Sequence, residues 1–161
     1  MEPKQKAILD LCRELPDAAA EAELRARAGE FTSAICSQIF DWRGVQNQSE
    51  LLVNARTREN EKETVFYFDG GSSGTLTVYA PDGGSFQFNP ADRIADAKAA
   101  TDAIAARAGV WFICGFDGAR WRVKLHSEED GWEAEVAAST EQLARAACAL
   151  LAAEAMRKEM R

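Results

Sequence analysis

His126 is the only histidine in the chain, so any cysteine–histidine nucleophile or histidine-containing metal site must use it. A nucleophilic pair needs a base within reach of the thiol, and a zinc site needs closely spaced ligands. The cysteines are far apart and form no CxxC pair: Cys12, Cys36, Cys114 and Cys148. We therefore expect no catalytic residue and no bound metal. We interpret the cysteines as small buried hydrophobic residues and His126 as part of a charged strand surface.

Two loops carry groups that can bind ions. The acidic run at residues 128–130 could bind a hard cation, but it lacks the alternating oxygen ligands of a calcium loop. The loop DGGSSG, residues 69–74, offers backbone amides and the hydroxyls of Ser72 and Ser73 to a phosphate group. It lacks the lysine and helix that complete a P-loop, so a flexible hairpin connection is the alternative interpretation.

Aromatic and basic residues lie in the same part of the chain as this loop. Tyr67 and Tyr79 could stack on a base, and Arg56 and Arg58 could contact phosphate oxygens. Core packing is the alternative for at least half of the aromatic residues, because alternation along a strand sends either Phe66 or Tyr67 inward. The candidate ligand-binding residues are Arg56, Arg58, Tyr67, Tyr79, Ser72 and Ser73, and no cofactor is implied.

The elements that must position these residues begin with helices in residues 1–43. Residues 4–15 repeat apolar side chains at helical spacing and end at Pro16. Asp17 predicts the cap of a second helix that stops at Gly29, and Thr32 predicts the cap of a third.

Residues 44–89 change to β-branched and aromatic residues with turn signals, which predicts an antiparallel meander. The expected strands are residues 51–57, 64–69, 74–80 and 85–89. This stretch combines flexible loops with aromatic residues and arginines, so we expect it to hold the binding specificity.

Residues 90–161 predict a helix, three short antiparallel strands and a last helix. Asn89 and Pro90 open the first helix, with Ile94 on its inner stripe, and the last helix starts at Ser139 or Thr140. The strands at residues 110–116, 120–126 and 132–138 are joined by turns too short for parallel pairing. On the second and third strands, alternation predicts an apolar core face and an opposite face that carries Arg120, Arg122, Lys124 and His126 against Glu133 and Glu135. The fold class is therefore α+β, and the 161 residues form one domain.

The net charge of −7 and the sequence pI near 4.8 disfavour a nucleic-acid partner. No apolar run is long enough to span a membrane, and the N-terminus has no signal-peptide pattern, so we expect a cytoplasmic protein. The alanine-rich stretches at residues 18–28 and 144–155 suit close helix approach in a homo-oligomer. High helix propensity alone is the alternative explanation for them.

Two stretches in residues 89–153 carry a family resemblance, NPADRIADAKAATDAI and WFICGFDGARWRVKLHSEEDGWEAEVAASTEQLARAACALLAA. Together they resemble the phage ABA sandwich domain, and SAICSQIFDWRG resembles the short helix ending in tryptophan that opens the family. The resemblance implies an antiparallel sheet between two helices, an α-β-α sandwich, and a phage or prophage origin. It implies no catalytic residues. The chain departs from the family pattern by its N-terminal helices and by its larger meander.

These observations favour a small phage or prophage binding protein over an enzyme. The expected function is to neutralise a host process, such as antiviral defence, in the host cell cytoplasm. The expected partner is a host effector protein or a small anionic nucleotide signal, bound stoichiometrically. The alternatives are a structural or assembly role in the virion, and a small hydrolase whose carboxylates converge only in the folded chain.

Overall fold

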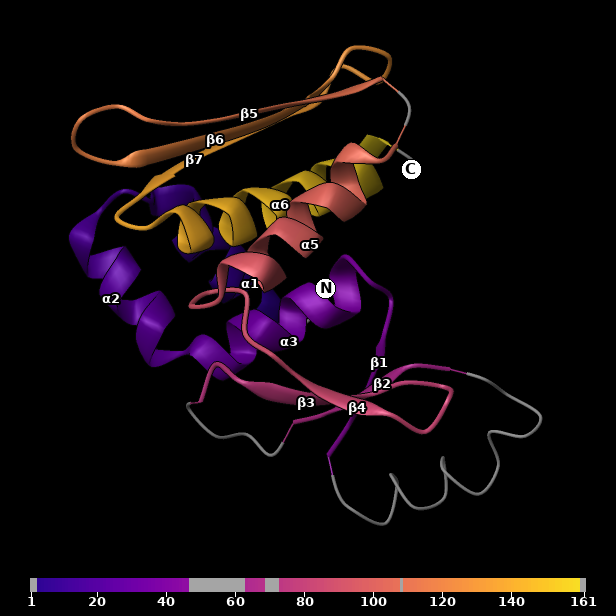
Figure 1. The fold of residues 1–161 in the computed structure, drawn as a ribbon. Coiled ribbons are helices and arrows are strands. Elements are labelled where there is room, and N and C mark those ends of the chain that lie inside the picture. The colour runs from indigo at the N-terminus through magenta and orange to yellow at the C-terminus, as the bar shows by residue number, and fades with distance from the viewer. Residues whose placement is uncertain (1–2, 47–62, 69–72, 108, 160–161) are drawn as a thin grey trace.

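The computed structural model describes residues 3–46, 63–68, 73–107 and 109–159. Its helices are α1 (Pro3–Glu14), α2 (Ala18–Ala26), α3 (Ala28–Gln38), α5 (Ile94–Ala105) and α6 (Glu141–Glu159). One sheet contains β1 (Arg43–Val45), β2 (Val65–Tyr67), β3 (Leu76–Tyr79) and β4 (Ser85–Phe88), and the other contains β5 (Val110–Phe116), β6 (Trp121–Ser127) and β7 (Glu133–Ala138). The predicted α+β class is confirmed. Figure 1 shows the helices lying between the two sheets.

The N-terminal helices begin where expected, with one difference in the third. The Asp17 carboxylate accepts a hydrogen bond from the Ala20 amide at 3.0 Å, which confirms the cap of α2. Helix α3 begins at Ala28, so Gly29 lies inside it and is buried. The expected stop at Gly29 was wrong, because the break falls two residues earlier at Arg27, whose φ and ψ of −109° and 33° leave the helical region.

Thr32 connects α3 to the small sheet and does not cap the helix. Its buried hydroxyl donates to the Gly74 carbonyl oxygen at 2.6 Å, just before β3 begins. Further along, the Asn89 side chain donates to Thr75 Oγ1 at 3.0 Å, and its backbone amide donates to Asp96 on α5 at 2.9 Å. These bonds fix the small sheet to the helical layer.

The small sheet has one strand that the sequence did not predict. Strands β2, β3 and β4 pair antiparallel as expected, whereas β1 joins β2 in parallel. A strand of three residues is too short to produce a recognisable period. The sequence left open whether Phe66 or Tyr67 points inward. Phe66 is the buried one, and Tyr67 is half-buried on the opposite face. The strand expected at residues 51–57 lies outside the described residues.

The larger sheet has the predicted antiparallel order β5-β6-β7. Lys124 and Glu133 form one of the expected cross-strand ion pairs at 3.3 Å. The resemblance placed this sheet between two helices, whereas α5 and α6 lie side by side and both cover one face of it (Figure 1). The face turned away from the helices carries exposed side chains.

Helix α5 begins later than expected, at Ile94, after a turn that follows Pro90. Ile94 was placed on the inner stripe, but it is 38% exposed because the first turn of the helix extends beyond the core. The buried residues of α5 are Ala97, Ala100, Thr101 and Ile104.

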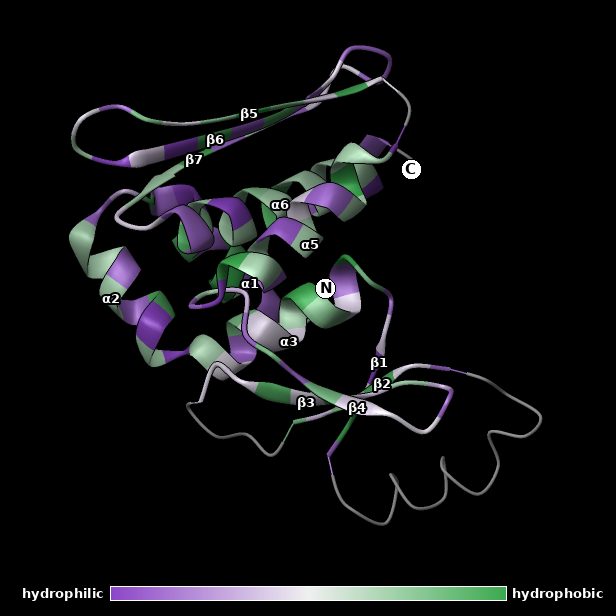
Figure 2. Ribbon diagram, viewed as in Figure 1, coloured by the Kyte–Doolittle hydropathy of each residue, from purple (hydrophilic) through white to green (hydrophobic). Residues whose placement is uncertain are grey.

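Helix α6 is the centre of the molecule. The sheet lies on one side of it, α5 lies beside it, and α1 and α3 contact it from the opposite side. Figure 2 shows α5 and α6 as adjacent helices with apolar and polar bands beneath the sheet. The buried residues of α6 are Leu143, Ala144, Ala146, Ala147, Cys148, Ala149, Leu150, Ala152, Ala153 and Glu154. The alanines of α6 are therefore core residues that allow close approach within the chain.

Enlarging one of these alanines should destabilise the fold. Ala147 is fully buried, so Ala147→Leu should lower the free energy of unfolding by about 1–3 kcal/mol through overpacking. Ala99→Leu is the matched control, because Ala99 is exposed on α5 and the two residue types have similar helix propensity. Denaturant unfolding measures both variants. Equal stability of the two variants would contradict the buried position of Ala147.

Candidate functional site

Strand β5 carries most of the large apolar side chains that the described residues expose. Five such side chains are exposed, and three of them belong to β5: Trp111 at 58%, Ile113 at 60% and Phe116 at 56%. Single exposed apolar residues are ordinary on protein surfaces, but a group of them marks an interaction surface. The exposed apolar surface of β5, which the sequence did not predict, is therefore the strongest candidate for a functional site.

The register of the sheet places the exposed side chains in three rows. We call the face turned away from the helices the outer face. Its apolar row is Trp111 and Ile113 on β5, its basic row is Arg122, Lys124 and His126 on β6, and its acidic row is Glu133 and Glu135 on β7. Trp111 lies opposite His126, and Ile113 lies opposite Lys124. Apolar side chains are thus adjacent to a basic row.

The charges of the outer face are largely compensated within the chain. Lys124 pairs with Glu133, and the Arg122 guanidinium donates to Asp117 at 2.6 Å. Asp117 also accepts hydrogen bonds from the Ala119 and Arg120 amides at 2.9 and 2.8 Å. The backbone hydrogen bonds make the largest contribution and, together with the Arg122 bond, lower the pKa of Asp117 to about 2. The same bonds stabilise the turn between β5 and β6. The apolar row, Trp111 and Ile113, is the part of this face whose side chains have no packing partner to cover them.

The opposite side of β5 is anchored to the helices. The Arg145 guanidinium of α6 lies 4.8 Å from the centre of the Phe112 ring, a cation–π contact. Arg145 is itself held by Glu141 at 2.7 Å and by the Thr101 hydroxyl at 3.2 Å. Phe116 lies against Trp121, with ring centres 5.4 Å apart. The strand therefore presents Trp111 and Ile113 from a supported position.

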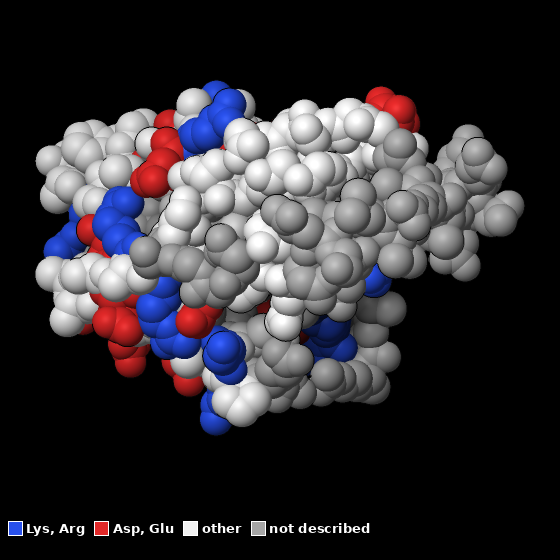
Figure 3. Space-filling model, turned by 90° about the horizontal axis from the view of Figure 1, so that it is seen from below, with Lys and Arg blue, Asp and Glu red and all other residues white. Residues whose placement is uncertain are grey.

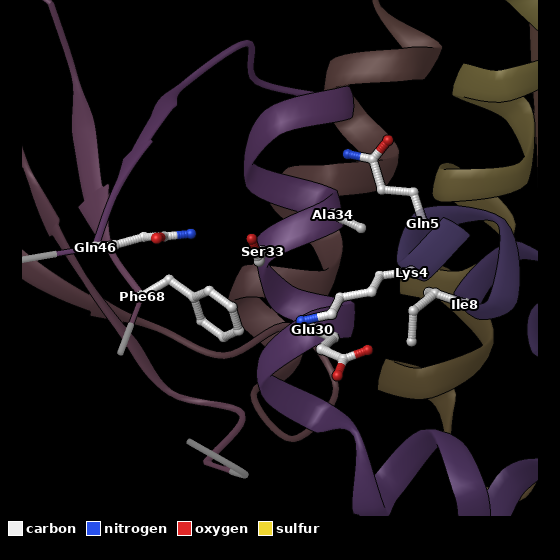
Figure 4. Close-up of a pocket in the computed structure, with 8 residues that line it drawn as sticks. All are labelled: Lys4, Gln5, Ile8, Glu30, Ser33, Ala34, Gln46 and Phe68. Atoms are coloured by element: carbon white, nitrogen blue, oxygen red, sulfur yellow. The ribbon is translucent and has the colours of Figure 1, made fainter. Parts of the chain in front are cut away.

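A small pocket lies between α1, α3 and the ends of β1 and β2 (Figure 4). Its volume is about 260 Å³, below the range of about 300–1,000 Å³ that is usual for small-molecule sites. Its lining residues are Lys4, Gln5, Ile8, Glu30, Ser33, Ala34, Gln46 and Phe68. Lys4 is the one cation of this lining, and Glu30 is already paired with Arg27 at 2.6 Å. The pocket has no surplus of positive charge for a nucleotide.

A second hollow of about 330 Å³ lies between α1, β7 and α6. Its lining includes the carboxylates of Glu133, Glu135 and Glu154 and the cations Arg13 and Lys158. Seen from the side of the small sheet, basic and acidic side chains are interspersed over the part of the molecule where α2 lies (Figure 3). These described surfaces suit mixed polar contacts better than a polyanion.

The structure brings together only part of the site predicted from the sequence. Tyr67 pairs with Thr77, and Tyr79 pairs with Val65, so the two tyrosines are diagonal neighbours on one face of the small sheet. Both are half-buried. Ser73 is exposed, and its hydroxyl accepts a hydrogen bond from the Thr75 amide at 3.2 Å. The other predicted ligand residues, Arg56, Arg58 and Ser72, lie outside the described residues.

Three cysteines are buried, as predicted: Cys12, Cys36 and Cys148. Burial raises the pKa of each of these thiols, that of Cys148 to about 12. Cys114 was also predicted to be buried but is only half-buried, because it lies on the edge strand β5, and burial raises its pKa too. His126 is half-buried on β6 opposite Glu133. The reactive thiolate form is thus disfavoured at all four cysteines.

Among the described residues, no group of three or more histidine, cysteine, aspartate or glutamate side chains is placed to hold a metal ion. In the same part of the chain, no helix is both long and apolar enough to cross a membrane. Comparison of the chain with protein-family models, curated proteins and solved structures finds no match.

The burial pattern predicts a clear order of thiol reactivity. Iodoacetamide should label Cys114 first in the folded protein, because Cys114 alone among the four is partly exposed. Mass spectrometry of labelled peptides measures the order, and labelling in urea provides the control in which all four react. Labelling of Cys12, Cys36 or Cys148 as fast as Cys114 would contradict the packing of α1, α3 and α6.

Proposed function

We propose that this chain is a binding protein that holds another protein through the outer face of the β5–β7 sheet. The observation that supports the proposal is the adjacent pair Trp111 and Ile113, both more than half exposed on a strand whose other face is anchored. With the family resemblance, we further propose that the chain is encoded by a phage or prophage. Its partner would then be a host protein of antiviral defence, neutralised by stoichiometric binding.

The rows of the outer face define the chemistry of this partner. Trp111 and Ile113 need an apolar groove, and a tryptophan at the centre of an interface commonly dominates the binding energy. Lys124 lies beside this pair but is already paired with Glu133, so the rim of the groove meets mixed polar groups and not a surplus of positive charge. The partner surface is therefore apolar with a polar border.

A protein partner accounts for this surface better than a nucleotide does. A nucleotide site needs a concave pocket with cationic or amide donors for the phosphates. The hollows of about 260 and 330 Å³ lie below and at the lower end of the usual range for such sites, and both combine cations with carboxylates. The apolar row on β5 lines neither hollow and is exposed on a strand surface, which suits contact with another macromolecule.

Replacement of one side chain tests the proposal. Trp111→Ser should weaken binding of the captured host protein by about 30-fold, because loss of a tryptophan hot spot costs about 2 kcal/mol or more. Ile94→Ser is the matched control, since Ile94 is also exposed and apolar but lies on α5. Each variant is compared with wild type by capture from host lysate and then by calorimetry on the purified partner.

The proposal predicts one bound partner per chain for wild type and for Ile94→Ser. Wild type, Ile94→Ser and Trp111→Ser should all unfold at the same temperature. Trp111→Phe should recover part of the affinity, because it restores an aromatic ring at the same position. Equal affinity of Trp111→Ser and wild type for every captured protein would exclude the outer face as the binding surface.

A further inference from the structure

Among the described residues, the edge of β5 is open over most of its length. The strand pairs with β6 on one side, and no strand of the described residues lies on its other side. The Gly109 carbonyl oxygen accepts from the Glu128 amide, and the Asp117 amide donates to the Arg120 carbonyl oxygen. Antiparallel pairing alternates, so the odd-numbered residues of β5 bond to β6, and the even-numbered ones direct their backbone groups outward.

Only one of these outward groups has a partner among the described residues, the Val110 amide, which donates to the Arg107 carbonyl oxygen at 3.3 Å. The remaining outward backbone groups are the Val110 carbonyl oxygen and the amides and carbonyl oxygens of Phe112, Cys114 and Phe116. Proteins usually protect an edge strand by a charge, a proline or a bulge. Residues 110–116 are seven in number and contain neither charge nor proline. Such an edge is suited to pair with another strand.

We propose that a second copy of this chain pairs with β5 in the antiparallel direction, which produces a two-fold dimer with a continuous six-stranded sheet. The inference goes beyond the proposed function. The dimer forms through the backbone edge of β5, whereas the outer face binds through side chains perpendicular to the sheet. In the dimer the outer faces of both copies lie on one side of the joined sheet, and Trp111 and Ile113 also contact the second copy across the edge.

The sequence of β5 is complementary to itself in this arrangement. A two-fold axis through Ile113, the middle residue of the strand, places Trp111 opposite Gly115 of the second copy. It also places Phe112 opposite Cys114, and Val110 opposite Phe116. Each pair thus matches a large side chain with a smaller one, and Phe116, exposed at 56%, gains a neighbour.

Gly115 carries the most specific part of this match. A Cβ atom built on Gly115 would meet no heavy atom within 4 Å, so the space above it is empty. Trp111 and Gly115 lie on the same face of β5, and the indole of one copy can cover the glycine of the other. An aromatic ring that covers a strand glycine stabilises the pairing of the two strands.

The outward backbone groups agree with the same register. Phe112 and Cys114 of the two copies become a hydrogen-bonded pair, because both direct their backbone groups away from β6. Ile113 and its symmetry mate become a non-hydrogen-bonded pair, in which side chains approach most closely. Apolar contact is thus greatest at the two-fold axis.

The net charge of −7 on each copy does not prevent this contact. The basic rows on β6 of the two copies would be about 14 Å apart, which is three strand spacings. This exceeds the Debye length of about 8 Å at physiological ionic strength, so their repulsion is largely screened. The acidic rows on β7 lie farther away still.

The oligomeric state of the full chain tests the proposal. Light scattering after gel filtration and analytical ultracentrifugation should give a dimer of the 17.6 kDa chain that dissociates on dilution. Ile113→Lys should raise the dimer dissociation constant at least about tenfold, because it places two like charges at the axis. Ile94→Lys, the same change at an exposed isoleucine of α5, should leave it unchanged.

Cys114→Pro tests the backbone contribution. Proline removes an amide that faces away from β6, which an edge strand tolerates, and it leaves the outer-face side chains in place. The variant should be monomeric. Circular dichroism shows whether it folds. Ile113→Lys changes only an exposed side chain and keeps the test valid if Cys114→Pro does not fold.

A wild-type chain that stays monomeric at every concentration overturns the dimer, as does an Ile113→Lys variant that dimerises like wild type. A monomeric wild type that still loses its host partner through Trp111→Ser overturns the dimer alone. A wild-type dimer that Ile113→Lys dissociates, with capture indifferent to Trp111→Ser, overturns the proposed function alone.

Discussion

The burial of the middle of α6, where the buried residues fall between Leu143 and Glu154, is the constraint on which the rest of the structure depends. Its alanines allow the sheet, α5, α1 and α3 to approach one helix closely, and its leucines fill the spaces between them. The middle of this helix is apolar on most of its circumference and must be surrounded, while its charged residues lie mainly toward its two ends. Both helices that accompany the sheet are therefore on its inner face, and in the described chain no helix covers the other face.

This arrangement explains why β5 differs from its neighbours. Strands β6 and β7 alternate apolar residues toward α6 with charged residues toward solvent, and Lys124 and Glu133 neutralise each other across them. Strand β5 has apolar residues on both faces and an open edge. Its inner face is held by Arg145, so the strand presents its outer face and its edge to other molecules from a fixed position. One uncharged strand thereby supplies two contact surfaces, its outer face and its edge.

Periodicity and turn chemistry predicted the elements but not what covers them. The Asp17 cap, the helix that ends before Pro16 and the register of β5–β7 follow from local patterns. Strand β1 could not be predicted from local patterns, because its partner strand lies about 20 residues further along the chain and a strand of three residues is too short to show an alternating pattern. Alternation assigns Trp111 and Ile113 to one face of a strand, but only tertiary packing decides that α5 and α6 leave this face open. The absence of charged residues from residues 110–116 was the one feature of the sequence that could have indicated an interaction surface on this strand.

The central claim is that Trp111 stands uncovered on an anchored strand, and fluorine NMR tests it directly. The chain has four tryptophans, so protein labelled with 5-fluorotryptophan gives four signals, and Trp111→Phe and Trp132→Phe assign two of them. At high dilution the Trp111 signal should show a large shift between H₂O and D₂O and strong broadening by a soluble paramagnet. The signal of Trp132, which is 5% exposed, should show little of either. A Trp111 signal that responds as weakly as that of Trp132 would mean that the outer face is covered, and it would contradict the account.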